Sequence, residues 1–415
     1  MISKSKLHQC DSTKVMVADA QSSDYLNKIE GFPKIRTVLY EDFMENISHY
    51  LRPKYYDYMS NDCNMLEMRS SGGGYFGKKR YGFGCLKYFN QTWSGHGLSD
   101  VALSVGLPST EGDEKDGKRI VTFIHLIPQA ISFESGDVMH GHLKIVPQRC
   151  KRNISTFCSV ISGPIPVYKE VFTISQFWGK GFYHGTVENL PRMALDLPFL
   201  LKHPHIKIHV AGRMEYLTLL GIDNSRLITK PIIKADILYM PPGGPCGNSP
   251  LLSTQILAST LASNVKGNAL NKRDTIVLIK RSKKRWFDNH YSILRMIMIH
   301  ASKLNLKVEV FNDNPLPHIN KTVEMFSRAL IVIGPHGAGA SNLLLSQPGT
   351  LFIEGLCYDS TNRANLCYRN MAQALGLRYY GLIYPDQCMA ITANQIETPL
   401  LEFLRAAVEN KLILR

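Results

Sequence analysis

The chain of 415 residues lacks the short patterns that mark several common sites. Its nine cysteines are scattered and none form Cys-x-x-Cys, the spacing typical of zinc and dithiol sites. The dinucleotide pattern G-x-G-x-x-G is absent from the second half of the chain, and the phosphate-loop pattern that ends in Gly-Lys-Ser/Thr is absent throughout. No Asp-x-Asp triplet occurs. These absences argue against a zinc site, a standard dinucleotide site and a P-loop nucleotidase.

The first residues also lack an apolar run. Residues 1–21 are polar and show no secretory signal, membrane helix or lipidation motif. Over the whole chain, 44% apolar and 20% charged residues are ordinary for a soluble globular protein. The net charge of +14 favours anionic partners, which are nucleic acid, anionic membrane or acidic small molecules. The only dense basic run is Lys280 to Arg285.

The stretch from Leu330 to Gly355 organises the rest of the chain. A β-branched run is followed by the glycine-rich turn 334–339, a short apolar helix and a second apolar run that ends in Glu354. Glycines in such a turn leave room for a ligand, and a helix start presents free N–H groups to a diphosphate. The pattern predicts a phosphate site at the carboxyl end of a parallel strand, or else a tight turn without a ligand.

The second half of the chain alternates strands with helices, which predicts a parallel doubly wound sheet. Residues 120–263 show the same alternation less clearly. We therefore expect an irregular N-terminal region (1–118), an N-terminal α/β domain (119–264) and a C-terminal α/β domain (273–415). The expected strands of the second half are 275–280, 307–311, 330–334, 350–354 and 378–384, and the expected helices are 291–303, 320–327, 362–374 and 396–409.

A second informative block runs from Gly179 to Arg192. Apolar periodicity predicts a helix from Phe182 to Leu201, bent or restarted at Pro191. His184 and Glu188 are four apart and share one helix face. They are candidates for acid–base chemistry, although an ordinary surface pair has the same spacing.

Both blocks resemble glycosyltransferase family 61, and the resemblance covers roughly Phe172 to Leu382. In the family a His-Gly-Ala-Gly block precedes an Asn and a Pro-Gly turn, and a Tyr-His block precedes Glu and Leu-Pro-Arg. Gly185 replaces the aromatic residue that the family more often has after the His. The resemblance implies a GT-B fold, in which two Rossmann-type domains face a cleft. It also implies inverting transfer of xylose, arabinose or N-acetylglucosamine from a UDP-sugar to a hydroxyl of a glycan or glycoprotein.

The resemblance also implies roles for individual residues. His184 and Glu188 are both candidates for the base, and the sequence does not separate them. Fixed guanidinium and helix N–H groups stabilise a leaving diphosphate, so we expect no metal cofactor. Glu324 is a further donor-side candidate. The expected donor-binding residues are Arg281, Arg285, His336, Gly337, Ala338, Gly339, Asn342 and Glu354.

The expected partners are the UDP-sugar and the acceptor, and no nucleic acid. The resemblance implies the lumen of the Golgi or endoplasmic reticulum, with membrane association only if an N-terminal anchor is missing from this chain. Two other classes stay open. One is an oxidoreductase or epimerase that uses the turn for a dinucleotide. The other is a non-catalytic nucleotide-sugar or nucleic-acid binder with a basic surface.

Overall fold

The computed structural model divides into two compact units. Unit 1 comprises residues 1–47 and 121–246, and unit 2 comprises residues 48–120 and 247–415. The structure describes residues 16–19, 36–39, 75–77, 83–84, 123–140, 143–146, 164–212, 214–241, 251–265, 272–357, 363–384 and 391–409.

Unit 2 is built on a parallel sheet with the strand order β13-β12-β14-β15-β17, and the short β4 pairs antiparallel with β17. The central strands carry β-branched and other apolar residues and are buried, as expected for a sheet covered on both faces. The predicted parallel sheet is therefore confirmed. Its strands are β4 (Phe83–Gly84), β12 (Thr275–Lys280), β13 (Lys307–Asn312), β14 (Ala329–Pro335), β15 (Leu351–Cys357) and β17 (Arg378–Tyr384).

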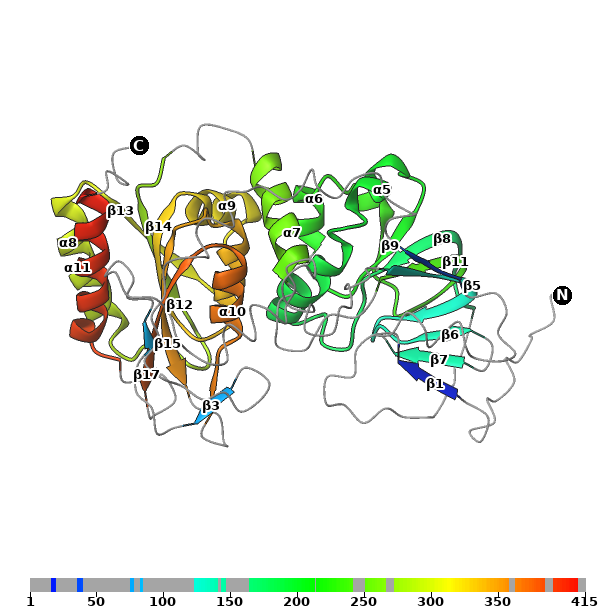
Figure 1. Ribbon diagram of the computed structural model, residues 1–415, viewed down its shortest axis with the longest axis horizontal. Helices are drawn as coiled ribbons and strands as arrows, with labels where there is room; N and C mark the ends of the chain where they lie inside the picture. The colour runs from blue at the N-terminus through cyan, green and yellow to red at the C-terminus, as the bar shows by residue number, and fades with distance from the viewer. Residues whose placement is uncertain are drawn as a thin grey trace, which may run out of the picture. The chain divides into compact units, whose positions relative to one another are not determined.

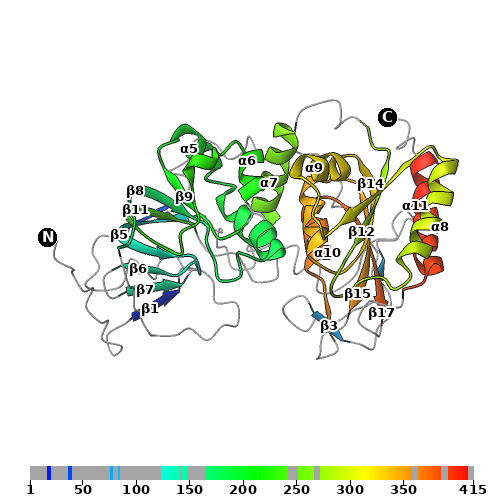
Figure 2. The ribbon, with the colours of Figure 1, turned by 180° about the vertical axis from the view of Figure 1, so that it is seen from behind.

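Helices cover both faces of this sheet (Figure 1). Helices α8 (His290–Lys303) and α11 (Ala393–Glu409) lie side by side on one face. Helices α9 (Ile319–Ser327) and α10 (Cys367–Ala374) cover the other, and the view from behind shows the same two layers (Figure 2). Strand residues such as Ile276 and Leu278 pack with Ile293, Ile297 and Phe403 of the first pair of helices.

The strand order of unit 2 reverses next to β12. The chain runs from β12 to β13 on one side and then crosses to β14 on the other side of β12. In open α/β sheets, ligands bind outside the carboxyl ends of the strands at such a switch point. The carboxyl ends of β12 and β14 are followed by Arg281 and His336, so the topology brings these two residues to one edge.

Unit 1 contains a mixed nine-stranded sheet with the order β1-β7-β6-β5-β11-β8-β9-β10, and β2 pairs with β5. Strands β11, β8, β9 and β10 are mutually parallel, whereas β5, β6 and β7 form antiparallel pairs. This unit is α/β but less regular than a Rossmann domain. Its strands are β1 (Met16–Asp19), β2 (Arg36–Leu39), β5 (Phe123–Phe133), β6 (Val138–His140), β7 (Leu143–Val146), β8 (Val167–Thr173), β9 (Lys207–His209), β10 (Leu227–Ile228) and β11 (Ile232–Met240), and its helices include α5 (Leu197–Lys202) and α6 (Met214–Leu219).

The structure differs from the sequence analysis in three places. Short strands of the region that was expected to be irregular join both large sheets, where β1 pairs with β7 and β4 pairs with β17. A further one, β3 (Tyr75–Gly77), forms a separate two-stranded sheet with β16 (Arg363–Asn365). Strand β16 also occupies the predicted start of α10. The expected domain boundary lay after α7 (Leu251–Asn264), whereas α7 packs against α10 and the glycine-turn helix within unit 2.

No helix in the described parts of the chain is both long enough and apolar enough to cross a membrane.

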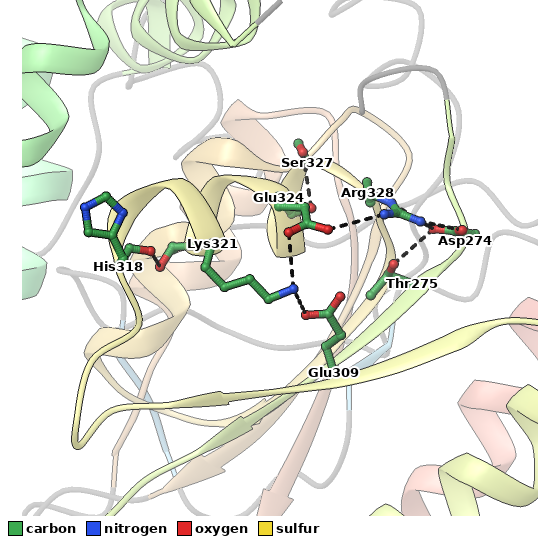
Figure 3. A network of polar contacts seen from close by, with 9 residues as sticks. Asp274, Thr275, Glu309, His318, Lys321, Glu324, Ser327 and Arg328 are labelled. Atoms are coloured by element: carbon green, nitrogen blue, oxygen red, sulfur yellow. Dashed lines mark hydrogen bonds and ion pairs between the residues drawn. The ribbon is translucent and has the colours of Figure 1, made fainter. Parts of the chain in front are cut away.

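An ion-pair network joins the amino ends of the unit 2 strands, opposite the edge that carries Arg281 and His336 (Figure 3). Nε and Nη2 of Arg328 both donate to the carboxylate of Asp274, at 2.6–3.0 Å. These two residues directly precede β14 and β12, so the pair fixes the start of two central strands. Burial opposes the charge on Asp274, but the hydrogen bonds from Arg328 and Thr275 outweigh it and lower the pKa of Asp274.

We predict that Arg328→Met lowers the free energy of unfolding by about 2 kcal/mol at neutral pH, because it leaves the mostly buried Asp274 carboxylate without its main donor. A carboxylate with a lowered folded pKa stabilises the fold above its ordinary value of 3.8 and loses that contribution as the pH falls below it. The difference between variant and wild type should therefore shrink at acid pH. Urea titrations at about pH 7 and about pH 3 measure it.

The control is Lys321→Met, since Lys321 is solvent-exposed and pairs with Glu309 and Glu324 at the surface. Lys321→Met should lower the free energy of unfolding by less than about 1 kcal/mol. Equal costs for the two variants would contradict a special role for the Arg328–Asp274 pair.

Candidate functional site

The glycine-rich turn of unit 2 is shaped around an arginine. Arg281 directly follows β12, and its Nη1 donates to the carbonyl oxygen of His336 at 2.9 Å. A Cβ atom at Gly337 would lie 2.0 Å from the same nitrogen. From the sequence we expected this glycine to leave room for a ligand. The structure shows that the guanidinium group of Arg281 occupies this room.

Two more glycines of the segment make the same kind of contact with β12. A Cβ atom at Gly334 or Gly339 would come within 2.8–2.9 Å of the side chain of Ile279. The turn therefore approaches β12 closely along its length. This packing fixes the turn and Arg281 as one unit, and no side chain larger than glycine is compatible with it at these positions.

A second arginine adds positive charge at this edge. Burial, followed by repulsion from Arg285, lowers the pKa of Arg281, while Asp313 partly offsets both. Asp313 follows β13, lies 3.7 Å from Nε of Arg281 and accepts from the backbone N–H of Ser282 at 2.8 Å. Arg285 has a φ of +58°, an uncommon conformation for a side chain of this size, and such strain gathers at functional sites. The edge is thus a concentrated positive site suited to a phosphate.

His336 is held by a buried carboxylate. Its Nδ1 lies 2.7 Å from an oxygen of Glu354, which is 0% exposed, and the other oxygen accepts from the hydroxyl of Tyr379 at 2.5 Å. Burial, followed by the charge of Glu354, raises the pKa of Tyr379 well above its usual range, so the phenol stays a donor. Gly381 stands opposite Glu354 in the strand register, which leaves space for this arrangement.

These contacts engage both oxygens of Glu354 within the protein, and its side chain is fully buried. It orients the imidazole and leaves Nε2 of His336 as the nitrogen available for a ligand. The ring of Tyr368 packs edge-on against His336 at 5.3 Å and limits its movement further.

The short helix after the turn is a 3₁₀ helix, η7 (Ala338–Leu345). The first N–H groups of any helix lack partners within it, so they are suited to an anion. Ala338 opens this helix and is partly exposed. The side chain of Asn342 is buried and donates to the carbonyl oxygen of Gly339 at 2.9 Å, so it braces the turn from inside.

A second histidine–glutamate pair lies in unit 1. Nδ1 of His184 lies 2.9 Å from an oxygen of Glu188, and Nε2 of Gln176 donates to the same oxygen at 2.9 Å. The side chain of Glu188 is 0% exposed, whereas that of His184 is 35% exposed. Of the two candidate bases, only the imidazole reaches solvent. Gln176 lies three residues after the end of β8 and was missed, although its place just beyond a strand could have signalled it.

The pair sits on an unusual turn. The predicted helix over 182–201 is broken, with a π-helical turn, η4 (His184–Asn189), then a 3₁₀ turn, η5 (Leu190–Met193), then α5. π-helical turns are rare and are frequent at functional sites. The restart at Pro191 agrees with the predicted bend. The polar side chains of Thr186 and Asn189 are buried beside the pair, which gives this part of unit 1 a polar interior.

Arg192 of the same block is structural. Its guanidinium donates to the carbonyl oxygens of Ile174, Ser175 and Pro241, each at 3.0 Å. These carbonyls follow β8 and β11, so one side chain ties together the carboxyl ends of two parallel strands. Burial lowers the pKa of Arg192 to about 10, opposed by the charge of Asp196. The segment that carries Gln176 therefore depends on Arg192.

One further candidate lies away from the site. Glu324 pairs with Arg328 and Lys321 in the network of Figure 3, at the amino ends of the strands. That position does not support a contact with a donor at the carboxyl edge. Among the residues that the structure describes, no group of three or more His, Cys, Asp or Glu side chains is placed to hold a metal ion.

The two histidines of these clusters lie in a segment that is similar to a known protein family. Residues 182–353 match the model of the family Glycosyltransferase 61. This match supports glycosyltransferase family 61 for the chain. The matched segment runs from just before the histidine–glutamate pair of unit 1 into strand β15, and it contains His184, His336, Arg281 and Arg285.

The segment also resembles a curated protein, the xylan glycosyltransferase MUCI21 of Arabidopsis thaliana, at 24% identity over 132 residues. The similarity covers 32% of this chain and 26% of that protein, so the chain spans about a quarter of the length of the relative it matches.

Among solved structures, a mutant of a flavo di-iron protein from Thermotoga maritima aligns over 52% of both chains at 10% identity. Its TM-score of 0.26 is too low to establish a shared fold.

We predict that Arg192→Met destabilises the protein by about 3 kcal/mol, because three buried carbonyl groups lose their donor at once. Urea denaturation measures the change. The control is Lys180→Met, since Lys180 is exposed and forms only a surface pair with Glu134. If Arg192→Met were as stable as the wild type and yet inactive, Arg192 would be a substrate contact and not a structural clamp.

Proposed function

We propose that the protein is an inverting glycosyltransferase that moves a sugar from a UDP-sugar to a hydroxyl of a glycan or glycoprotein. The observation that carries the proposal is the contact between Arg281 and His336, within the matched segment. It combines a guanidinium group, an imidazole and a helix start at the switch point of a parallel sheet. This is a site for the diphosphate of a nucleotide-sugar.

The positive charge at this edge also has a role in catalysis. As the bond between sugar and diphosphate breaks, negative charge grows on the leaving phosphate oxygen. Arg281, Arg285 and the first N–H groups of η7 stabilise that charge without reorganising. His336, oriented by Glu354, donates a hydrogen bond from Nε2 in its doubly protonated form. We propose that these groups act without a divalent metal.

The acceptor hydroxyl needs a base, and the geometry of unit 1 favours His184 for that role. Its Nδ1 is occupied by Glu188, so Nε2 accepts the proton as the hydroxyl oxygen attacks the anomeric carbon from the face opposite the leaving group. Glu188 is fully buried and fixes the tautomer and orientation of the ring, as the carboxylate does in a catalytic triad. Gln176 holds Glu188 in turn.

Finer points belong to the same proposal. The family resemblance supports xylose, arabinose or N-acetylglucosamine as the sugar, a GT-B architecture for the two α/β units, and the lumen of the Golgi or endoplasmic reticulum. The relative is named a xylan glycosyltransferase, which supports a glycan acceptor. Asn320 of the sequon Asn-Lys-Thr is exposed at the start of α9, which is compatible with a luminal glycoprotein.

We expect UDP to bind in the presence of EDTA, as measured by calorimetry, and Arg281→Ala to weaken that binding by about tenfold to a hundredfold, the loss of one charge-assisted contact. The matched control is Lys283→Ala, which removes one positive charge from the same exposed segment without touching the turn. Binding of NAD with an affinity that exceeds that for UDP, or loss of UDP binding in EDTA, would contradict the proposed donor site.

We further expect His184→Ala to lower the transfer rate about 1,000-fold while the affinity for UDP stays unchanged, because a base and not a donor contact is lost. Added imidazole should restore part of the activity of this variant, but not that of Glu188→Gln. The matched control is His205→Ala, an exposed histidine that pairs with Glu170 at 3.2 Å in the same unit. An undiminished rate in His184→Ala would show that another group is the base.

A further inference from the structure

Two aromatic side chains stand exposed beside His184. Phe177 is 46% and Trp178 47% exposed, and their rings contact each other edge-on at 4.7 Å. The ring centroids of Trp178 and His184 are 6.1 Å apart, and the two planes are tilted by only 31°. A single exposed aromatic residue needs no explanation, but an adjacent pair next to a candidate base does.

The turn that carries this pair is rigid. The N–H of Gly179 donates to the carbonyl oxygen of Gln176 at 2.9 Å, and the N–H of Gly181 donates to that of Trp178 at 2.8 Å. A Cβ atom at Gly179 would lie 2.6 Å from the side chain of Asn189, so the turn is packed directly onto η4. The fold therefore fixes the backbone that carries the indole beside His184, which lowers the entropy cost of binding a ligand.

From these observations we infer that the exposed face of Trp178 is a stacking surface for one pyranose unit of the acceptor. The inference rests on the proposed function and adds the acceptor subsite to it. A β-linked pyranose with equatorial hydroxyls presents axial C–H bonds on its flat faces, and these pack on the electron-rich face of an indole. Its hydroxyls point outward around the rim.

The geometry relates this surface to the base. The separation of 6.1 Å between the two rings is about the width of one sugar ring. A sugar stacked on Trp178 therefore brings a hydroxyl of its own, or of the next unit in the chain, to the imidazole of His184. Phe177 supports the indole from the side, and the charged Lys180 beside it keeps the surroundings polar, which suits an oligosaccharide better than an apolar partner. Trp178 lies outside the segment that matches the family model.

The test measures binding of xylotetraose and cellotetraose to the whole chain by calorimetry, with no donor present. We expect Trp178→Ala to weaken oligosaccharide binding about tenfold and Trp178→Phe to restore most of it, since a smaller ring still stacks. In transfer assays the same change should appear in the KM for the acceptor and not in the affinity for UDP. The matched control is Leu201→Ala, an exposed apolar residue of unit 1 on α5.

The outcomes separate this inference from the proposed function. Unchanged oligosaccharide binding in Trp178→Ala, in a protein that binds UDP and transfers sugar, overturns the stacking surface alone. Absence of UDP binding and of transfer in the wild type overturns the proposed function, whatever Trp178 does. Reduced and carboxymethylated α-lactalbumin, an extended polypeptide without glycans, is the comparison ligand. If it binds Trp178 as tightly as the oligosaccharides do, the surface is for protein and the inference is wrong.

Discussion

The close approach of strand β12 to the glycine-rich turn is the constraint on which the donor side of this protein depends. Ile279 fills the space that Gly334 and Gly339 leave, and Arg281 fills the space at Gly337. The arginine is therefore part of the turn and not a mobile surface charge. A guanidinium group fixed in this way needs little reorganisation when a phosphate binds or when charge develops on it, which is the condition for strong electrostatic catalysis. The glycines make room for the close approach of β12 and Arg281, and Arg281 in turn is placed to contact the proposed ligand.

A similar histidine–glutamate arrangement is found in each unit. A fully buried glutamate holds Nδ1 of a histidine and is itself held by a neutral donor, Gln176 for Glu188 and Tyr379 for Glu354. Burial keeps each carboxylate away from substrate and gives it a single task, which is to orient a ring. The two histidines differ in surroundings. His184 is partly exposed beside an aromatic pair, as suits contact with an acceptor, whereas His336 is enclosed beside two arginines, as suits contact with phosphate.

Much of unit 2 was predictable because its strands and helices have strong, distinct periodicities. Strands β12 and β17 have the predicted bounds, and α8, α9 and α11 begin within three residues of expectation. Unit 1 was less predictable, since antiparallel pairs such as β5 with β11 join segments more than 100 residues apart. The π-helical turn could not be seen in the pattern either. Its residues follow a helical period, and the contact of Asn189 with the turn at Gly179 joins it to a segment outside the helix.

The amino-acid sequence by itself determined the kinds of residue, their order along the strands and the resemblance of two motifs to one family, because local periodicity and short motifs are written in neighbouring residues. It left His184 and Glu188 equivalent and did not indicate the contacts of Gln176 and Tyr379. The tertiary structure shows that Glu188 and Glu354 are buried and hydrogen-bonded, and that His184 reaches solvent. Whether a polar group reaches solvent or is buried, and which donor saturates it, depends on segments distant in the chain that fold against it, and exposure and hydrogen bonding together determine whether a residue binds a substrate or positions another residue.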